Sequence, residues 1–381
     1  MLGIYIHVPF CEKVCDYCDF RVMPSCSSDL FSEYTDLLVR EMQGFARENP
    51  GALESAETLY LGGGTPSLLP ADCLSRIFGA LRDLGVDVPR LREVTMEFNP
   101  ESCNESTVSL ARECGVGRFS LGLQSFRDEI LERIGRRHSV ETGLRALELL
   151  CSQPGIEVNG DLMFNLPGQS LEQFLGDLER LAGFPLNHVS FYGLTVAART
   201  RLGHRIARGE LSVDEDLYGE MYLRGAELLR GMGFERYEVS NFCRVGRRSI
   251  HNVNYWERGE YVGFGPGAHS YFRGLRFNAP EIYPRWREFV CNEMPREKLC
   301  LDSLTSDDIW TERVWLSMRQ SAGLDLEKLR AEGIELPESC YSKWVGNGCL
   351  EREGGFLRLA GRGWLLMDTI VTDVLNGYIP N

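Results

Sequence analysis

Short apolar runs alternate with longer amphipathic stretches from Gly3 to Leu194. The runs are rich in β-branched and aromatic residues, as strands are, and apolar positions in the stretches recur at helical spacing. Strands are predicted at Gly3–Val8, Thr58–Leu61, Glu93–Phe98, Arg118–Leu121, Glu157–Phe164 and His188–Gly193. Helices are predicted at Leu30–Ala46, Cys73–Leu84, Ser106–Cys114, Val140–Cys151 and Leu171–Leu181. Six such alternations indicate an α/β fold in which helices cover a parallel sheet.

The pattern changes after Asp214. A helix at Leu217–Met232 and a strand at Arg236–Val239 are predicted to precede a stretch rich in glycine and aromatic residues, Asn241–Gly274. Further helices are predicted at Asp307–Gln320, Leu324–Ala331 and Glu338–Val345, then a hairpin around Phe356–Leu359 and a last helix at Gly363–Leu375. We therefore predict a core over residues 1–235, a connecting segment over 236–300 and a small C-terminal domain over 301–381.

Composition narrows the class of protein. The chain has 381 residues, of which 43% are apolar and 25% charged, as in a soluble globular protein. A net charge of −14 argues against a nucleic-acid partner. The first predicted strand leaves no room for a targeting segment, and no apolar run is long enough to span a bilayer. With 13 scattered cysteines, these features predict a reducing, cytoplasmic setting; contact with a membrane surface is left open.

Three cysteines follow the first predicted strand at the spacing CxxxCxxC: Cys11, Cys15 and Cys18. Three thiolates can hold three irons of a 4Fe–4S cluster and leave the fourth open to an exchangeable ligand. A zinc site, a disulfide pair and chance are the alternatives. Zinc would need a fourth ligand nearby, and Cys26 is eight residues further on without a paired partner.

This motif, with Tyr17 just before its third cysteine, resembles the radical S-adenosylmethionine superfamily. Within it the chain is similar, nearly end to end, to the branch of the coproporphyrinogen III dehydrogenases (HemN) and the haem chaperones (HemW). The resemblance implies a partial (β/α)6 TIM-type barrel and a mainly helical, winged-helix-like C-terminal domain with a structural or lid role. It also implies that S-adenosylmethionine binds the open iron and is cleaved to a 5′-deoxyadenosyl radical by one electron from the cluster.

A glycine-rich run, Gly62-Gly63-Gly64-Thr65, directly follows the second predicted strand. Glycines let the backbone approach a ligand closely, and free N–H groups there could bind a carboxylate; a tight turn is the alternative. The resemblance assigns Gly63, Gly64 and Thr65 to the methionine part of the cofactor. Glu97, at the end of the third predicted strand, is assigned to its polar groups, with a surface or capping role as the alternative.

The resemblance implies further cofactor contacts. A first group contains two tyrosines, Tyr5 and Tyr17. A second group corresponds to positions that line a second S-adenosylmethionine in the dehydrogenase, and each of these residues alone could be structural: Gln124, Arg136, Asp161 and Gly193.

The segment HNxxYW resembles an element associated with haem binding in the chaperones of this branch, and the resemblance makes four residues candidates: His251, Asn252, Tyr255 and Trp256. An imidazole is a good axial ligand of haem iron, and aromatic rings offer a flat apolar surface to a macrocycle. A packed polar corner of the fold is the alternative. His269, in the dense element Gly263–Ser270, is the next candidate ligand, and His7 is either a core residue or a substrate contact.

Two departures separate the chain from the dehydrogenases. A further cysteine of their motif is replaced by Phe20, and their long N-terminal arm is absent, because the first ligand is already Cys11. We therefore interpret the chain as a haem chaperone that passes haem to an acceptor protein. Oxidative decarboxylation of coproporphyrinogen III is the first alternative, and a HemN-like radical methyltransferase is the second. The sequence names neither the acceptor, the electron donor nor the oligomeric state.

Overall fold

The strands predicted in the first half of the chain form the centre of one sheet. The computed structural model describes residues 1–24, 27–294 and 296–377. Six parallel strands lie in the order of the sequence: β1 (Leu2–Val8), β2 (Ala56–Gly63), β3 (Glu93–Phe98), β4 (Arg118–Gln124), β5 (Glu157–Phe164) and β6 (His188–Gly193). Parallel neighbours in sequence order form the wall of a β/α barrel, so the predicted fold class is confirmed.

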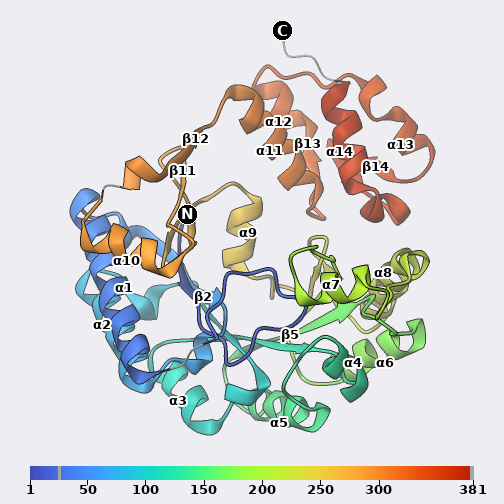
Figure 1. Cartoon of the computed structure of the whole chain (residues 1–381). Coiled ribbons are helices and arrows are strands. Elements are labelled where there is room, and N and C mark those ends of the chain that lie inside the picture. Colours follow the sequence, from blue (N-terminus) through green and yellow to red (C-terminus); the bar gives the residue numbers. More distant parts are fainter. Residues whose placement is uncertain (25–26, 295, 378–381) are drawn as a thin grey trace.

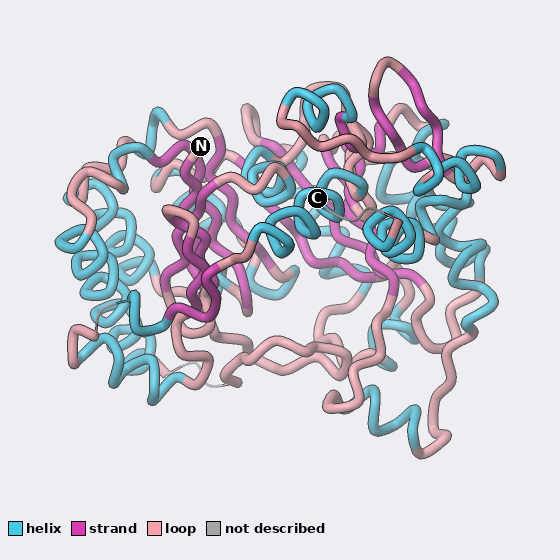
Figure 2. Tube along the Cα trace, turned by 90° about the horizontal axis from the view of Figure 1, so that it is seen from above, coloured by secondary structure: helices cyan, strands magenta, loops and turns pink. Residues whose placement is uncertain are grey.

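Helices cover the outer side of this wall (Figure 1). They are α1 (Ser28–Glu48), α2 (Ala71–Asp83), α3 (Glu105–Glu113), α4 (Asp128–Arg133), α5 (Val140–Cys151), α6 (Leu171–Ala182), α7 (Arg201–Ala207) and α8 (Glu215–Gly231). Side chains of alternate residues such as Ile4 and Ile6 are fully buried in the main core with Leu38 and Met42 of α1. Since successive side chains of a strand point to opposite faces, Tyr5 and His7 lie on the other face, inside the barrel. Seen from above, the strands lie between helices on both flanks (Figure 2).

The sheet continues beyond these six strands at both ends. At the edge of β1 that does not face β2, strand β9 (Glu260–Phe264) pairs with β1 in parallel. It is followed in the sheet by three antiparallel strands, β10 (His269–Phe272), β11 (Leu275–Asn278) and β12 (Cys300–Ser303). Beyond β6 lie β8 (Asn241–Cys243) and β7 (Glu235–Arg236). Two helices complete this region: α9 (Ile250–Trp256) and α10 (Tyr283–Cys291).

The strand β9 was not predicted, because it lies in a glycine-rich segment and glycine is uncommon inside strands. Gly263 is nevertheless required there: a Cβ on it would lie 2.3 Å from the carbonyl oxygen of His269 on β10. Gly265, at φ 101°, similarly lies against the carbonyl oxygen of His7, 2.4 Å from where its Cβ would be. Residues 263–268 are therefore the end of a strand and a tight turn. The predicted strand Arg236–Val239 is likewise replaced by the two short strands β7 and β8.

The C-terminal unit has its own core, which includes Val314, Met318, Leu357 and Ile370. Its elements are α11 (Ser306–Met318), β13 (Leu324–Asp325), α12 (Leu326–Ala331), α13 (Ser342–Gly346), β14 (Leu350–Glu353), β15 (Phe356–Leu359) and α14 (Met367–Asn376). The strands form a separate sheet in the order β13-β15-β14. Helix, strand, two helices and a hairpin make the winged-helix-like arrangement that was expected, shown in orange to red in Figure 1.

Three predicted C-terminal helices begin later than expected. The first begins after strand β13, because the Asp325 side chain accepts hydrogen bonds from the N–H groups of Glu327 and Lys328 and caps α12. The other two begin as 3₁₀ turns, at Glu338–Cys340 and Gly361–Leu365. None of the helices in the described ranges is both long and apolar enough to cross a bilayer. The boundaries 1–235, 236–300 and 301–381 stay a prediction.

Candidate functional site

A cavity of about 470 Å³ lies inside the barrel at the carboxyl ends of the strands. Ten of the predicted cluster and cofactor residues line it: Cys11, Cys15, Tyr17, Cys18, Gly63, Gly64, Glu97, Gln124, Arg136 and Asp161. Asn252 of α9 lines it as well. Tyr5, Thr65 and Gly193 do not line it, and Gly193 packs instead against the ring of Tyr218, 2.5 Å from where a Cβ would be.

Two cysteine sulfurs of the motif accept hydrogen bonds from residues of the barrel. The Thr65 hydroxyl donates to Cys11 Sγ at 3.5 Å, and Arg136 Nη1 donates to Cys15 Sγ at 3.6 Å. Among the described residues, no three Cys, His, Asp or Glu side chains converge on one ion position, as zinc would need. A 4Fe–4S cluster needs its cysteine sulfurs further apart than a single ion does, because each cysteine binds a different iron. Three thiolates on the wall of one cavity, beside the Arg136 guanidinium, are a donor set that fits a 4Fe–4S cluster. Cys26, the other cysteine weighed for zinc, lies outside the described residues.

Asn99 connects these two donors. Its amide Nδ2 donates to the Thr65 hydroxyl at 2.9 Å, and its Oδ1 accepts from Arg136 Nη2 at 2.9 Å. Arg136 Nη2 also donates to the Gly122 carbonyl oxygen at 2.7 Å, whereas its buried Nε has no partner among the described residues. A cation with an unused donor beside the thiols suits an anionic ligand. Sequence analysis missed Asn99, although it stands in the same EFNP element as Glu97.

The glycine-rich run holds the cluster loop against β1. The Gly64 N–H donates to the Val8 carbonyl at 2.8 Å, and the Thr65 N–H donates to the Phe10 carbonyl at 2.7 Å. A Cβ on Gly64 would lie 2.5 Å from that Phe10 oxygen. The Gly63 N–H donates to Glu97 at 3.0 Å. The N–H groups that were expected to be free for a ligand are therefore used within the protein, and the close approach of two chains is what requires glycine here.

Two carboxyl groups stand on the wall of this cavity. Glu97 accepts hydrogen bonds from the Tyr60 hydroxyl at 2.7 Å and from the Gly63 N–H, and burial raises the pKa of Glu97 to about 7. Asp161 accepts from the Ser120 hydroxyl at 2.9 Å and from the Asn159 amide at 2.8 Å, and burial raises the pKa of Asp161. Both groups can therefore change protonation when a charged ligand binds.

Gln124 has a backbone that few residues with a side chain adopt. Its φ is 67°, in the left-handed region, at an irregularity of the pairing between β4 and β5. Such a conformation costs about 1 kcal/mol or more for a residue other than glycine. It turns the end of the strand so that Gln124 lines the cavity, and bulges of this kind often direct a side chain at a functional site.

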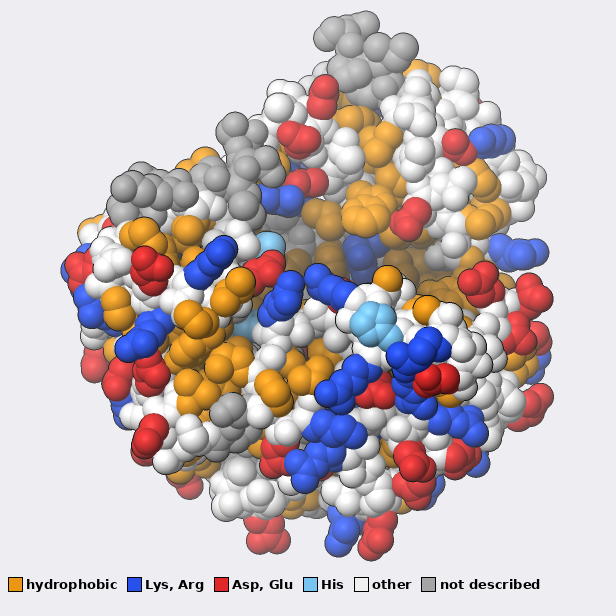
Figure 3. Space-filling view, viewed as in Figure 1, with side chains coloured by type: hydrophobic (Ala, Val, Ile, Leu, Met, Phe, Trp, Pro, Cys, Tyr) orange, Lys and Arg blue, Asp and Glu red, His pale blue; other side chains and the backbone are white. Residues whose placement is uncertain are grey.

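A second cavity, of about 480 Å³, adjoins the first, and Phe20 lines both. Its wall is aromatic and rich in charged residues, with His7 and His269 among the lining residues. Asp19 and Glu281 also line it and pair with Arg199 and Arg21. The aromatic residues are Tyr5, Phe20, Tyr255, Trp256, Tyr261 and Tyr271, and the cationic ones are Arg21, Arg199, Arg258 and Arg276. Leu316 of α11 also lines it, so the C-terminal unit closes one side. Figure 3 shows the surface hollowed between the barrel and that unit.

The HNxxYW element lies between the two cavities. Asn252 lines the first, and Tyr255 and Trp256 line the second. His251 lines neither and is fully buried. Its Nδ1 is 2.8 Å from the Thr58 hydroxyl and its Nε2 is 2.7 Å from the Tyr255 hydroxyl, so both ring nitrogens are hydrogen-bonded. Burial lowers the pKa of His251 to about 3, so the ring is neutral.

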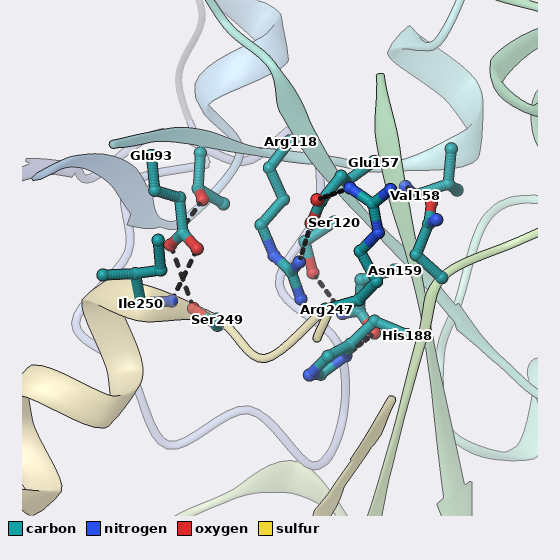
Figure 4. A network of polar contacts seen from close by, with 12 residues as sticks. Glu93, Arg118, Ser120, Glu157, Val158, Asn159, His188, Arg247, Ser249 and Ile250 are labelled. Carbon is teal, nitrogen blue, oxygen red and sulfur yellow. Dashed lines mark hydrogen bonds and ion pairs between the residues drawn. The ribbon is translucent and has the colours of Figure 1, made fainter. Parts of the chain in front are cut away.

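Glu93 fixes the start of the helix that carries this element (Figure 4). Its carboxylate accepts hydrogen bonds from the Ser249 hydroxyl at 3.0 Å, the Ile250 N–H at 2.6 Å and the His251 N–H at 3.2 Å. A carboxylate at a helix N-terminus satisfies N–H groups that have no partner within the helix. Sequence analysis missed this role, because the only signal was a glutamate at the start of a predicted strand.

Arg319, just after α11, attaches the C-terminal unit to α9. Its guanidinium donates to the fully buried carboxylate of Glu238 at 2.5 Å and stacks over the ring of Trp256 at 3.9 Å. The next residue, Gln320, donates to the Trp256 carbonyl oxygen at 3.1 Å. The unit therefore contacts the HNxxYW element directly.

Sequence comparisons relate the chain to known proteins. The profile of the Radical SAM superfamily matches residues 5–181. The chain is 34% identical over 376 residues to a Mycobacterium tuberculosis protein named heme chaperone HemW, covering 98% of this chain and 94% of that protein. It is 34% identical over 272 residues to the heme chaperone HemW of Escherichia coli, covering 71% of this chain and 70% of the other.

Among solved structures, the chain is similar in fold to the coproporphyrinogen III oxidase HemN of Escherichia coli. The two superimpose with a TM-score of 0.84 at 20% identity, and the match covers 98% of this chain and 89% of that one. At this identity the likeness concerns the fold alone, and it extends through the C-terminal unit.

Proposed function

Because the chain belongs to the HemW family of the radical S-adenosylmethionine superfamily, we propose that it is a haem chaperone, which binds haem and delivers it to an acceptor protein. The observation that carries the proposal is the pair of neighbouring cavities that share Phe20 in their lining. One contains the three cysteines of the motif, and the other has an aromatic wall with four arginines, two carboxylates and two histidines. We place the protein in the cytoplasm.

The first cavity holds the resident cofactors in this proposal. Cys11, Cys15 and Cys18 bind three irons of a 4Fe–4S cluster, and Glu97 and Asp161 contact S-adenosylmethionine from the barrel wall. When bound, the pair supplies one-electron chemistry. The chain's own part is to orient the ligands, through the hydrogen bonds of Thr65 to Cys11 and Arg136 to Cys15, and to cover them from solvent.

The second cavity holds haem as cargo. Haem combines a flat apolar macrocycle, two carboxylates and an iron that binds imidazole, and each of these finds its counterpart in the lining. The volume of about 480 Å³ lies within the range of small-molecule sites. One side of the cavity is closed by Leu316 of the C-terminal unit, so movement of that unit would release the cargo to the acceptor.

The test compares the chaperone with the dehydrogenase. Protein purified under anaerobic conditions and reconstituted with iron and sulfide is titrated with haem, followed by absorption spectroscopy. Binding at about one haem per chain is expected, followed by transfer of that haem to apomyoglobin as a probe acceptor. The same protein, given coproporphyrinogen III, dithionite and S-adenosylmethionine, is expected to form no protoporphyrinogen IX. Decarboxylation without haem binding would replace the chaperone by the dehydrogenase.

A further inference from the structure

The family element HNxxYW contains the obvious candidate for an iron ligand, but its histidine is not available to a ligand. His251 has no exposed surface, and both ring nitrogens are hydrogen-bonded, to Thr58 and Tyr255. Its ring also stacks on Tyr60, with centroids 5.2 Å apart, and packs 3.1 Å from where a Cβ on Gly3 would be. Binding iron would require His251 to break two buried hydrogen bonds and leave its packing, which is costly.

The contacts of His251 give it a different role. Through its Nε2 it holds the Tyr255 hydroxyl, and the Tyr255 ring in turn packs edge-on against Tyr261 at a centroid distance of 4.5 Å. Tyr255 and Tyr261 both line the second cavity. His251 therefore positions the aromatic wall from behind, without touching what lies inside the cavity.

His269 has the properties that His251 lacks. It is exposed, lines the second cavity and makes no side-chain hydrogen bond within the described parts of the chain. Its neighbour Ser270 is buried and accepts a hydrogen bond from the Gly263 N–H at 2.9 Å. This bond fixes which face of β10 is turned toward the core. Because side chains alternate along a strand, the His269 imidazole is directed away from the core on a rigid element.

The cationic side of the cavity is suited to carboxylates. Arg258 and Arg276 both pair with the single carboxylate of Glu312, Arg258 at 3.1 Å and Arg276 at 2.6 Å. One positive charge of this group is therefore not neutralised by its partner. The buried Nε of Arg276 has no hydrogen-bond partner among the described residues. A planar guanidinium with an unused donor is well suited to bind a carboxylate.

We infer that haem sits in the second cavity with the His269 imidazole on its iron and its propionates on Arg258 and Arg276, and that His251 is a positioning residue for the aromatic wall. The inference rests on the proposed function, because it takes haem as the ligand of the second cavity. It assigns the residues that recognise each part of haem, and none of the four has a part in the cluster site.

The test is spectroscopic and uses the full chain reconstituted with its cluster. His269→Ala is compared with His251→Ala and with His204→Ala, which removes an exposed histidine of α7 that lines neither cavity. In the parent and in His204→Ala, absorption and paramagnetic resonance spectra should show ferric haem with an imidazole ligand. In His269→Ala this signature should disappear and return when free imidazole is added. His251→Ala should keep it while binding haem more weakly.

A second variant tests the propionate contacts independently. Arg276→Ala should weaken haem binding about tenfold or more, which is the scale of one charged hydrogen bond, and should leave the iron signature unchanged. Cluster iron content, measured in every variant, reports whether the barrel is folded. A parent spectrum in His269→Ala, or loss of the imidazole signature in a folded His251→Ala, would overturn the ligand assignment. Failure of the parent to bind haem would instead reject the proposed function.

Discussion

The Tyr60 hydroxyl donates a hydrogen bond of 2.7 Å to Oε1 of Glu97. The ring of the same tyrosine stacks on His251, which holds Tyr255 on the wall of the second cavity. A carboxyl group beside the cluster site is thus connected, through one tyrosine and one histidine, with the aromatic wall of the other cavity.

Glu97 should make cofactor binding depend on pH. Its pKa, raised to about 7 by burial, means that the carboxyl is largely ionised at about pH 8 and largely protonated at about pH 6. S-adenosylmethionine carries a positive sulfonium, so it favours the ionised form. Its affinity, measured by anaerobic calorimetry, should therefore fall as the pH is lowered through 7.

The matched variant is Glu97→Gln, which keeps the shape of the side chain and removes the charge. At about pH 8 it should bind S-adenosylmethionine about tenfold more weakly, an effect of about 1.4 kcal/mol. Between about pH 6 and 8 its affinity should change little. An equally steep pH profile in this variant would assign the titration to another group, with Asp161 the next to test.

The cluster assignment is tested by removing single thiols. Cys15→Ala should lose most of its bound iron and sulfide after anaerobic reconstitution, because two remaining thiolates do not hold a 4Fe–4S cluster firmly. Cys291→Ala removes an exposed thiol of α10 and should keep the full complement. Equal iron content in the two variants would contradict the assignment.

The Thr65 hydroxyl should tune the reduction potential of the cluster. A hydrogen bond to a ligand sulfur stabilises the more negative, reduced state and so raises the potential. Thr65→Val removes the donor to Cys11 and retains the branched shape, so the potential should become more negative by tens of millivolts. For one electron, about 59 mV corresponds to a tenfold change in equilibrium. Potentiometric titration monitored by paramagnetic resonance measures the shift.

Thr65→Ser is the control for that experiment, because it retains the hydroxyl. Its potential should lie near that of the parent. A serine variant that shifts as far as the valine variant would attribute the change to packing rather than to the hydrogen bond.

The contact between Arg319 and Glu238 should contribute strongly to stability. Glu238 is fully buried, and removing one partner of a buried ion pair typically costs about 3–5 kcal/mol. Arg319→Ala should therefore lower the free energy of unfolding in urea by that amount. Arg313 of α11 pairs with the partly exposed Glu332, so Arg313→Ala should cost about 1 kcal/mol or less. Similar losses in both variants would show that Arg319 is not buried against Glu238.

The sequence predicted the six parallel strands because each is a local apolar run between turn residues. The sequence also predicted that most residues of the first cavity lie close together, since residues at the carboxyl ends of parallel strands meet at one edge of the sheet. It did not predict β9, where the glycines required by the close approach of β10 weaken the strand signal. Gln124, with its positive φ, is also invisible to periodicity, because its strain depends on the pairing with β5.

The role of His251 shows the limit of motif reasoning most clearly. The HNxxYW pattern indicates which residues occur together but not which way each side chain faces. The partner that occupies the imidazole Nδ1 is Thr58, on the distant strand β2. No local property of the segment around His251 reveals that contact.

The pairing of β1 with β9 has a consequence for how the chain acquires its structure during synthesis. Leu2 of β1 pairs with Ala56 on one side and with Glu260 on the other, so the first strand finds its second neighbour only after most of the chain has left the ribosome. Pairing across such sequence separation is slow. A fragment that ends at residue 235 would therefore leave β1 with a bare, aggregation-prone edge.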